Sequence, residues 1–312
     1  MKIYDYDKHQ PFNLEEKHIN KYGEDKLLLF DAPYQPEIKE SKRNRVYLFK
    51  SEVNPCCNLI FLHGIGNHNI PYLSWFARWF SKRGVNVFYF ILPYHEGRAR
   101  KGWKGGEPFF HSSPAHCVVK FYEAVKDVRR TIDLIESFDE FKDYPVNLMG
   151  YSFGGMISAM ALALDTRIKK GILVYTGGNW RWINWHSPYT EVVREKYRKV
   201  GNEYGCRSEE DCIRFRKDPI KIVNSFKTID DIFDKSPVGC FHYDPLSYAK
   251  FITQPVLAFR GMFDRIIPLK STSELLSLIK NKRVVWLPSG HKSSYLFRRI
   301  IARVSLNFLK SS

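Results

Sequence analysis

The stretch NLMGYSFGGMIS, residues 147–158, decides the fold. An apolar, strand-like run ends there, one serine stands between glycines, and an apolar run of helical character follows. Gly150 and Gly154 lie two residues before and two residues after Ser152, and they remove the Cβ atoms that would clash in a very sharp turn. The spacing predicts that Ser152 is held at a strand-to-helix turn. A glycine-rich turn with an ordinary serine is the alternative interpretation of these letters alone.

Short apolar runs alternate with helical patterns from about residue 45 onward. This alternation predicts an α/β fold with a mostly parallel central sheet that is covered by helices on both faces. The runs expected to form strands are 45–49, 58–62, 85–92, 146–149, 171–175, 256–259 and 284–287. Apolar residues at intervals of three and four predict helices over 72–80, 118–135, 156–164, 271–279 and from about 295 to the end.

The alternating pattern breaks down between residues 177 and 250, where helical and polar segments rich in aromatic residues replace it. We therefore expect one core domain, made of residues 1–176 and 251–312, with residues 177–250 inserted as a helical cap or lid. The insertion opens with GGNWRWINWHSPY.

The composition is that of a folded soluble protein, with 44% hydrophobic and 26% charged residues in a chain of 312. The chain carries 49 Lys and Arg against 33 Asp and Glu, a formal net charge of +16. The basic clusters are scattered and no nucleic-acid module accompanies them, so we expect a solvated basic surface and no nucleic-acid partner. No secretory signal and no bilayer-spanning run are recognisable, which predicts a cytoplasmic protein without stable membrane insertion. The sequence leaves the oligomeric state open.

Six cysteines lie at positions 56, 57, 117, 206, 212 and 240, without paired C-x-x-C spacing. No cysteine–histidine cluster suggests zinc, so no metal site is expected. Free thiols are the expected state. A disulfide between Cys206 and Cys212, which would close a small loop, is the alternative.

A strand, a sharp turn with a serine, and a buried helix within an alternating sheet are together the setting of a nucleophile elbow. In this setting residues 45 to 310 resemble the α/β-hydrolase superfamily, in particular its serine esterases and lipases. The resemblance implies a triad with Ser152 as nucleophile. The segment VLAFRGMFDRIIP, residues 256–268, matches the family pattern for the acid and points to Asp264. The segment VVWLPSGHKSS, residues 284–294, supplies His291.

The resemblance also implies an oxyanion hole. FLHGIGNH, residues 61–68, has the His-Gly-x-Gly form of the family, which points to the backbone N–H groups of Ile65 and Phe153 as donors. His63 is expected to shape this loop rather than to act as a base. His111 and Ser112, on a later loop, are expected to be polar surface residues.

These residue types suit one chemistry. A serine hydroxyl is a poor nucleophile that needs an adjacent base, His291, whose tautomer Asp264 would fix. The expected function is hydrolysis of a small-molecule carboxylic ester through an acyl-enzyme intermediate, without a metal or organic cofactor. Thioesterase, peptidase or acyltransferase activity on the same triad remains an alternative, and so does a ligand-binding protein without turnover.

Aromatic residues near the expected cap suggest a substrate pocket. Trp180, Trp182 and Trp185, together with Tyr189 and Trp103, are expected to wall it, since ligand sites are commonly concave and lined by aromatic side chains. Arg181 would favour a substrate carrying negative charge. The alternative is that the tryptophans simply pack the insertion onto the sheet.

Overall fold

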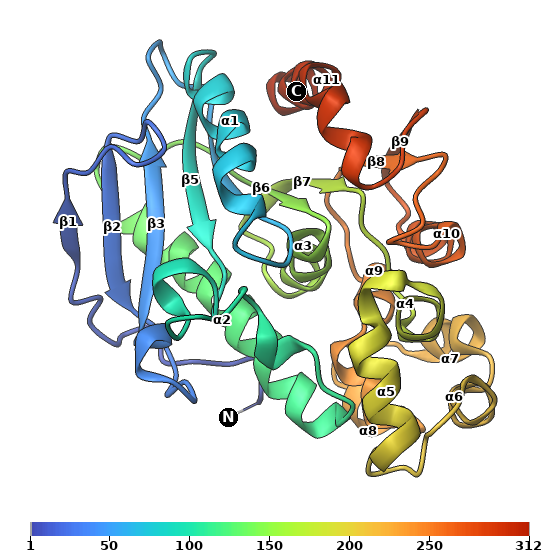
Figure 1. Ribbon diagram of the computed structural model, residues 1–312. Helices are drawn as coiled ribbons and strands as arrows, with labels where there is room; N and C mark the ends of the chain where they lie inside the picture. The colour runs from blue at the N-terminus through green and yellow to red at the C-terminus, as the bar shows by residue number, and fades with distance from the viewer. Residues whose placement is uncertain (1, 312) are drawn as a thin grey trace.

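The computed structural model describes residues 2–311, and a nine-stranded sheet organises them (Figure 1). The strand order across the sheet is β1-β2-β3-β5-β4-β6-β7-β8-β9. The strands are β1 (Glu15–Lys17), β2 (Lys26–Asp31), β3 (Arg43–Phe49), β4 (Cys57–Leu62), β5 (Val85–Ile91), β6 (Val146–Tyr151), β7 (Ile168–Val174), β8 (Val256–Gly261) and β9 (Lys282–Leu287).

Eleven α-helices occur among the described residues. They are α1 (Asn69–Ser81), α2 (Pro114–Ser137), α3 (Phe153–Leu164), α4 (Trp180–His186), α5 (Glu191–Val200), α6 (Glu209–Arg216), α7 (Pro219–Ser225), α8 (Asp231–Asp234), α9 (Pro245–Ala249), α10 (Leu269–Leu278) and α11 (Arg298–Lys310). Six short 3₁₀ segments complete the set: η1 (Lys39–Lys42), η2 (Glu96–Arg98), η3 (Glu107–Phe109), η4 (Pro188–Thr190), η5 (Gly239–Tyr243) and η6 (Lys292–Phe297). Within residues 2–311 no helix combines the length and the apolar character needed to cross a lipid bilayer.

The sheet is mostly parallel, as predicted. The five pairs from β5 through β4, β6, β7 and β8 to β9 are parallel, and the three pairs that join β1, β2, β3 and β5 are antiparallel. The expectation that the sheet begins near residue 45 was wrong, because β1 and β2 extend it at one edge. β1 is three polar residues long, too short for any periodicity in the sequence to mark it.

Helices cover both faces of the sheet, which confirms the predicted fold class. Alternate residues of β4 face opposite ways: Ile60 belongs to the core under α2 and α3, and Phe61 to the core under α1 and α11. Every residue of β4 is buried, as expected of a central strand that is covered on both sides. Figure 1 shows α1 and α11 together on one side of the sheet.

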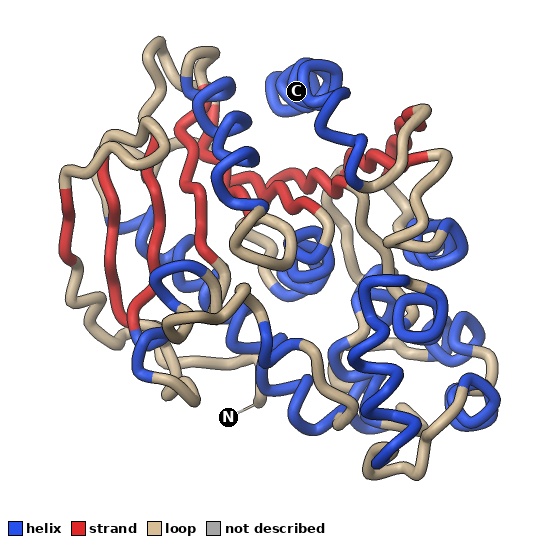
Figure 2. The backbone as a smooth tube through the Cα atoms, viewed as in Figure 1, coloured by secondary structure: helices blue, strands red, loops and turns tan. Residues whose placement is uncertain are grey.

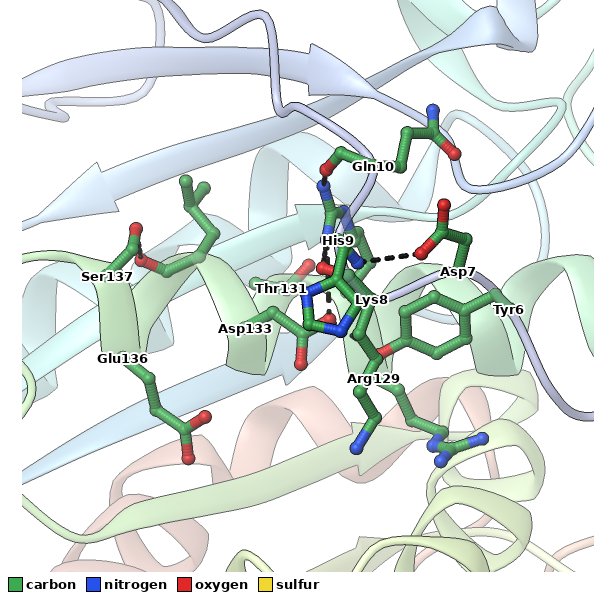
Figure 3. A network of polar contacts seen from close by, with 12 residues as sticks. Tyr6, Asp7, Lys8, His9, Gln10, Arg129, Thr131, Asp133, Glu136 and Ser137 are labelled. Atoms are coloured by element: carbon green, nitrogen blue, oxygen red, sulfur yellow. Dashed lines mark hydrogen bonds and ion pairs between the residues drawn. The ribbon is translucent and has the colours of Figure 1, made fainter.

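The N-terminal segment is fastened to α2, as Figure 3 shows. The Tyr6 hydroxyl donates to Asp133 at 2.7 Å, and Arg130 donates to the Lys8 carbonyl at 3.0 Å. These contacts fix the segment before β1 against the outer side of a core helix. It therefore lies on the helix layer rather than at the carboxyl edge of the parallel strands.

Residues 177–250 leave the sheet after β7 and return to it at the neighbouring strand β8. They contain helices α4 to α9 and no strand, as the blue and tan segments of Figure 2 show. Aromatic contacts join them to α2: the ring of Phe121 lies 5.3 Å from that of Trp180 and 5.2 Å from that of Tyr243. The division of the chain into a core domain and a cap remains a prediction.

Candidate active site

Ser152 occupies the sharp turn between β6 and α3. Its backbone has φ 53° and ψ −116°, a conformation that L-residues rarely adopt and that costs about 1–3 kcal/mol. The close approach of the neighbouring loop explains the glycine at 154, because a Cβ there would lie 2.5 Å from the backbone oxygen of His63. The surrounding chain therefore holds Ser152 in a strained position against the loop that follows β4.

Three side chains from distant parts of the sequence meet at this turn. The Oγ atom of Ser152 lies 2.9 Å from Nε2 of His291, and Nδ1 of His291 lies 2.8 Å from Oδ2 of Asp264. The tautomer with its proton on Nδ1 donates to Asp264 and leaves Nε2 to accept a proton from Ser152. Thus the structure brings together all three residues that the sequence singled out.

Asp264 is fixed by its own loop. Its other oxygen, Oδ1, accepts hydrogen bonds from the backbone N–H groups of Ile266 and Ile267, both at 2.9 Å. The carboxylate is buried and the His291 side chain is mostly buried, with 4% and 13% of their side-chain surfaces exposed. A carboxylate held by two backbone donors keeps its orientation toward the imidazole without needing a cation beside it.

Two tyrosines that the sequence analysis did not single out brace the segment around His291. The Tyr175 hydroxyl contacts Oγ of Ser289, and the Tyr151 hydroxyl contacts Oγ of Ser294. The Tyr175 and His291 rings also meet edge to face, with centroids 6.0 Å apart and planes at 86°. Burial raises the pKa of the Tyr151 hydroxyl, so it stays neutral. Each tyrosine ends or directly follows a strand, but only the fold reveals its partner.

Two free backbone donors lie near Ser152, one on the loop after β4 and one at the start of α3. A Cβ at Gly64 would lie 3.4 Å from the Cβ of Ser152, so this loop runs against the serine. Within residues 2–311 the backbone N–H groups of Ile65 and Phe153 donate no hydrogen bond. Unpaired donors on two sides of a serine hydroxyl are what an oxyanion hole requires.

Two buried histidines hold this loop in place. His63 accepts at Nε2 from the Leu92 N–H at 3.1 Å, so its proton lies on Nδ1, which donates to the Gly64 carbonyl at 2.6 Å. His95 accepts at Nε2 from the Gly66 N–H at 3.1 Å. Burial lowers the pKa of His63 to about 4 and that of His95 well below its usual value, so both rings are neutral near pH 7. His63 thus has the structural role expected of it.

Two cavities meet at Ser152. The first, called the apolar cavity below, has a volume of about 80 Å³ and lies between the sheet edge and residues 177–250. The second, called the polar cavity, has a volume of about 450 Å³ and reaches the side of His291. The apolar cavity is lined chiefly by Phe109, Phe110, Phe121, Phe153, Met156, Trp180, Ile183, Val193, Tyr243 and Ile267. Besides Ser152, its polar lining residues are His111, Asn184, Ser187, Thr190 and Tyr189, and Tyr189 lines both cavities. The polar cavity is lined by Gly64, Ile65, His68, Asn69, Tyr72, Tyr151, Ser152, Tyr189, Ile266, His291, Lys292 and Tyr295.

Of the four tryptophans expected to wall the pocket, Trp180 lines the apolar cavity and the other three line neither cavity. Trp182 donates from Nε1 to Glu274 at 2.9 Å, Trp185 packs on Tyr197, and Trp103 lies beside Arg100. The reason is helical geometry. Residues 180, 182 and 185 point in different directions around α4, about 100° apart per residue, whereas 180, 183 and 184 share one face. That spacing of three and four is the signal that the sequence analysis did not use.

Two further expectations were wrong. Arg181 does not face the substrate space, because its Nε donates to Glu209 at 2.8 Å. His111 lines the apolar cavity rather than the open surface, and Ser112 is buried. The polar residues of this loop predicted a surface position, but the loop contributes His111 to the cavity wall together with Phe109 and Phe110.

All six cysteines are free thiols, as expected, so Cys206 and Cys212 do not form the alternative disulfide. In the part of the chain that the structure describes, no group of three or more His, Cys, Asp or Glu side chains is arranged to hold a metal ion.

Known structures of similar architecture include esterases and peptidases. Acetyl xylan esterase 1 from Thermoanaerobacterium sp. JW/SL YS485 is 17% identical, with a TM-score of 0.61 over 99% of this chain and 92% of that one. An acetyl xylan esterase from Paenibacillus sp. R4 is also 17% identical, with a TM-score of 0.62 over 94% and 89%. An acylaminoacyl peptidase from Pyrococcus horikoshii is 13% identical, with a TM-score of 0.61 over 95% of this chain but only 41% of its own.

Identities this low establish a shared fold and nothing finer. No curated protein matches the sequence. The sequence pattern described as "Alpha/beta hydrolase family" matches residues 59–301, which is more than half of the chain and includes Ser152, Asp264 and His291. The chain therefore belongs to the alpha/beta hydrolase family.

Proposed function

We propose that this protein is a serine hydrolase that cleaves carboxylic esters through an acyl-enzyme intermediate. The observation that carries the proposal is the continuous line of contacts from Ser152 through His291 to Asp264, at 2.9 and 2.8 Å. Both distances are those of formed hydrogen bonds, so the serine has a base within reach and the base has an orienting carboxylate.

The proposed reaction has two halves. The Ser152 hydroxyl gives its proton to Nε2 of His291 while Oγ attacks the ester carbonyl, and the N–H groups of Ile65 and Phe153 stabilise the oxyanion. His291 then returns the proton to the departing alcohol as the carbon–oxygen bond breaks. A water molecule, deprotonated by the same histidine, attacks the acyl-serine, and Ser152 recovers its proton as the acid leaves.

Ester cleavage is preferred over the other uses of such a triad for two reasons. The similar solved structures include acetyl xylan esterases that span nearly the whole chain, whereas the acylaminoacyl peptidase is more than twice as long as the part that aligns. The polar cavity beside His291 also opens to solvent, which admits the water of the second half-reaction and so favours hydrolysis over acyl transfer.

Substitution of Ser152 by Ala tests the proposal. We expect kcat for p-nitrophenyl acetate to fall by about 10⁴ to 10⁶, because the nucleophile of such a unit is lost. Ser305→Ala is a matched control, since Ser305 is buried in α11 and its hydroxyl has no hydrogen-bond partner in the described chain. Retention of more than about a tenth of wild-type kcat by Ser152→Ala would overturn the assignment.

Asp264→Asn separates orientation from nucleophilicity. Asparagine keeps the size of the carboxylate but not its charge, so His291 is held in the wrong tautomer and kcat should fall by about 10⁴ with an unchanged melting temperature. A wild-type rate would mean that another carboxylate orients His291. Thioester and amide substrates with the same acyl group, measured beside the ester, then decide between the esterase and its alternatives.

A further inference from the structure

The two cavities at Ser152 differ in size and in the residues that line them, and the position of His291 assigns their roles. His291 lines the polar cavity and does not line the apolar one. In the proposed mechanism, on which this inference rests, the histidine must hand its proton to the alcohol oxygen that leaves. The alcohol part of the ester therefore lies in the polar cavity, and the acyl part lies in the apolar cavity.

The apolar cavity sets a limit on acyl length. Its volume is about 80 Å³. An apolar protein cavity of about 150 Å³ accommodates benzene, which corresponds to roughly 25 Å³ for each carbon and hence to about three carbons here. With the carbonyl carbon at Ser152, the acyl group is limited to about four carbons. Phe121, Ile183 and Val193 line the cavity, and all three are buried.

The polar cavity suits a larger and more hydrophilic group. By the same ratio its volume of about 450 Å³ holds roughly eighteen non-hydrogen atoms. Four polar side chains on its wall have no hydrogen-bond partner within residues 2–311: His68, Tyr189, Lys292 and Tyr295. Carboxylate side chains are missing from its lining in that part of the chain.

Hydroxyl groups of a substrate are the natural partners of such a wall. A substrate hydroxyl can accept a hydrogen bond from the Lys292 ammonium group, and it can both donate to and accept from the hydroxyls of Tyr189 and Tyr295. The Tyr295 ring meets Tyr72 edge to face, with centroids 4.9 Å apart, which fixes two aromatic rings against the same space. A group without hydroxyls would desolvate these polar atoms and leave them unpaired, at a cost in affinity.

We infer that the substrate is an ester of a short acyl group, of up to about four carbons, with a polyhydroxylated alcohol. The acyl limit is set by the wall that Ile183 contributes from α4, and the alcohol preference is set by Lys292 and Tyr295.

The acyl limit is tested with p-nitrophenyl acetate, butyrate and octanoate. We expect kcat/KM to fall by about tenfold to a hundredfold from butyrate to octanoate, because the longer chain overfills the cavity. Ile183→Ala should raise the octanoate-to-butyrate ratio by about tenfold, since it removes three carbons from the wall. Ile232→Ala is the matched control, as Ile232 is buried in α8 and lines neither cavity.

The ratio within one variant does not depend on how much of the protein is folded. Should Ile183→Ala not yield folded protein, Val193→Ala makes the same test with a smaller deletion from the same wall. The acyl limit is overturned if the wild type has equal kcat/KM values for butyrate and octanoate. It is also overturned if Ile232→Ala changes the octanoate-to-butyrate ratio as much as Ile183→Ala does.

The alcohol preference is tested with 6-O-acetylglucose and cyclohexylmethyl acetate, which are acetates of primary alcohols with rings of similar size. We expect the glucose ester to have a kcat/KM at least about tenfold higher, corresponding to one or two net hydrogen bonds. Lys292→Met combined with Tyr295→Phe should abolish this preference while keeping the shape of the wall. Leu296→Ala is the control, because Leu296 is 76% exposed and lines neither cavity.

An equal or higher kcat/KM for cyclohexylmethyl acetate in the wild type overturns the alcohol preference. The outcomes separate this inference from the proposed function. Hydrolysis of no ester at all contradicts the proposed function, whereas hydrolysis without any contrast in acyl length or alcohol type contradicts only the substrate class.

Discussion

Gly154→Ala tests whether the close contact between the elbow and the loop after β4 is what holds the site together. A Cβ at this position would lie 2.5 Å from the carbonyl oxygen of His63 and 2.7 Å from that of Leu62. Real Cβ atoms essentially never come within 3.0 Å of such an atom, so the loop and the turn must separate by at least about 0.5 Å. Both obstructing atoms belong to the backbone, and no side-chain rotation relieves the clash.

Two effects compete in this variant. Alanine favours a helix over glycine by up to about 1 kcal/mol, but position 154 lies in the first turn of α3, where that gain is smallest. The clash displaces Ser152 from the donor at Ile65, and a misplacement of about 1 Å costs on the order of a hundredfold in rate. We therefore expect kcat/KM for p-nitrophenyl acetate to fall by about tenfold to a hundredfold, together with a lower melting temperature.

Gly171→Ala is the control for this experiment. Its Cβ would meet Cδ1 of Leu162 at 2.5 Å, which is the end of a side chain that can rotate, and it lies in β7 away from the triad. Its melting temperature should fall modestly with no change in kcat/KM. A wild-type kcat/KM and a raised melting temperature in Gly154→Ala would refute the argument, because helix propensity would then outweigh the contact.

Two further predictions concern stability. Burial lowers the pKa of His63 from 6.5 to about 4. Between these two pH values the unfolded chain binds a proton at this histidine and the folded chain does not. The free energy of unfolding should therefore fall by about 3 kcal/mol as the pH drops from above 6.5 to about 4. Urea unfolding between pH 7 and pH 4 should show a smaller loss for His63→Gln than for the wild type, and an equal loss would contradict the assignment. Arg216 and Asp244 form a buried ion pair at 2.7 Å, and Asp244 also accepts from the Trp180 N–H at 3.0 Å. Arg216→Met leaves the Asp244 carboxylate buried without its cation, so it should lower the free energy of unfolding by about 3–5 kcal/mol. Arg198→Met breaks an exposed pair with Glu191 and should leave the urea midpoint nearly unchanged; equal effects of the two variants would show that burial is not what matters.

The three residues proposed as a triad could be named from the sequence because each follows a strand of recognisable pattern, and the family resemblance indicated which residue after each strand to choose. The carboxyl ends of parallel strands meet at one edge of the sheet, so Ser152 after β6 and Asp264 after β8 had to approach each other once the fold was known. The glycines at 150 and 154 added a second, independent signal. The glycine spacing around Ser152 and the order of the parallel strands therefore both indicated the turn after β6 as the candidate site.

The substrate space was less predictable because it depends on where side chains point in a segment without regular order. Trp182 and Trp185 look equivalent to Trp180 in the sequence, but only one face of α4 is turned to Ser152. The bracing of His291 by Tyr175 also joins residues more than a hundred positions apart, and no spacing announces it. β1 was missed for a different reason: it is only three polar residues long, and it forms by pairing with the neighbouring strand β2.

Covalent labelling of the intact protein by a fluorophosphonate tests the nucleophilic role of Ser152 most directly. The reagent phosphonylates an activated serine, so intact mass and peptide mapping should find one adduct on Ser152. Ser152→Ala should take up none, and His291→Ala should react at least about a hundredfold more slowly, since the base that activates Oγ is gone. An unlabelled wild-type protein, or an adduct on another serine, would contradict the account.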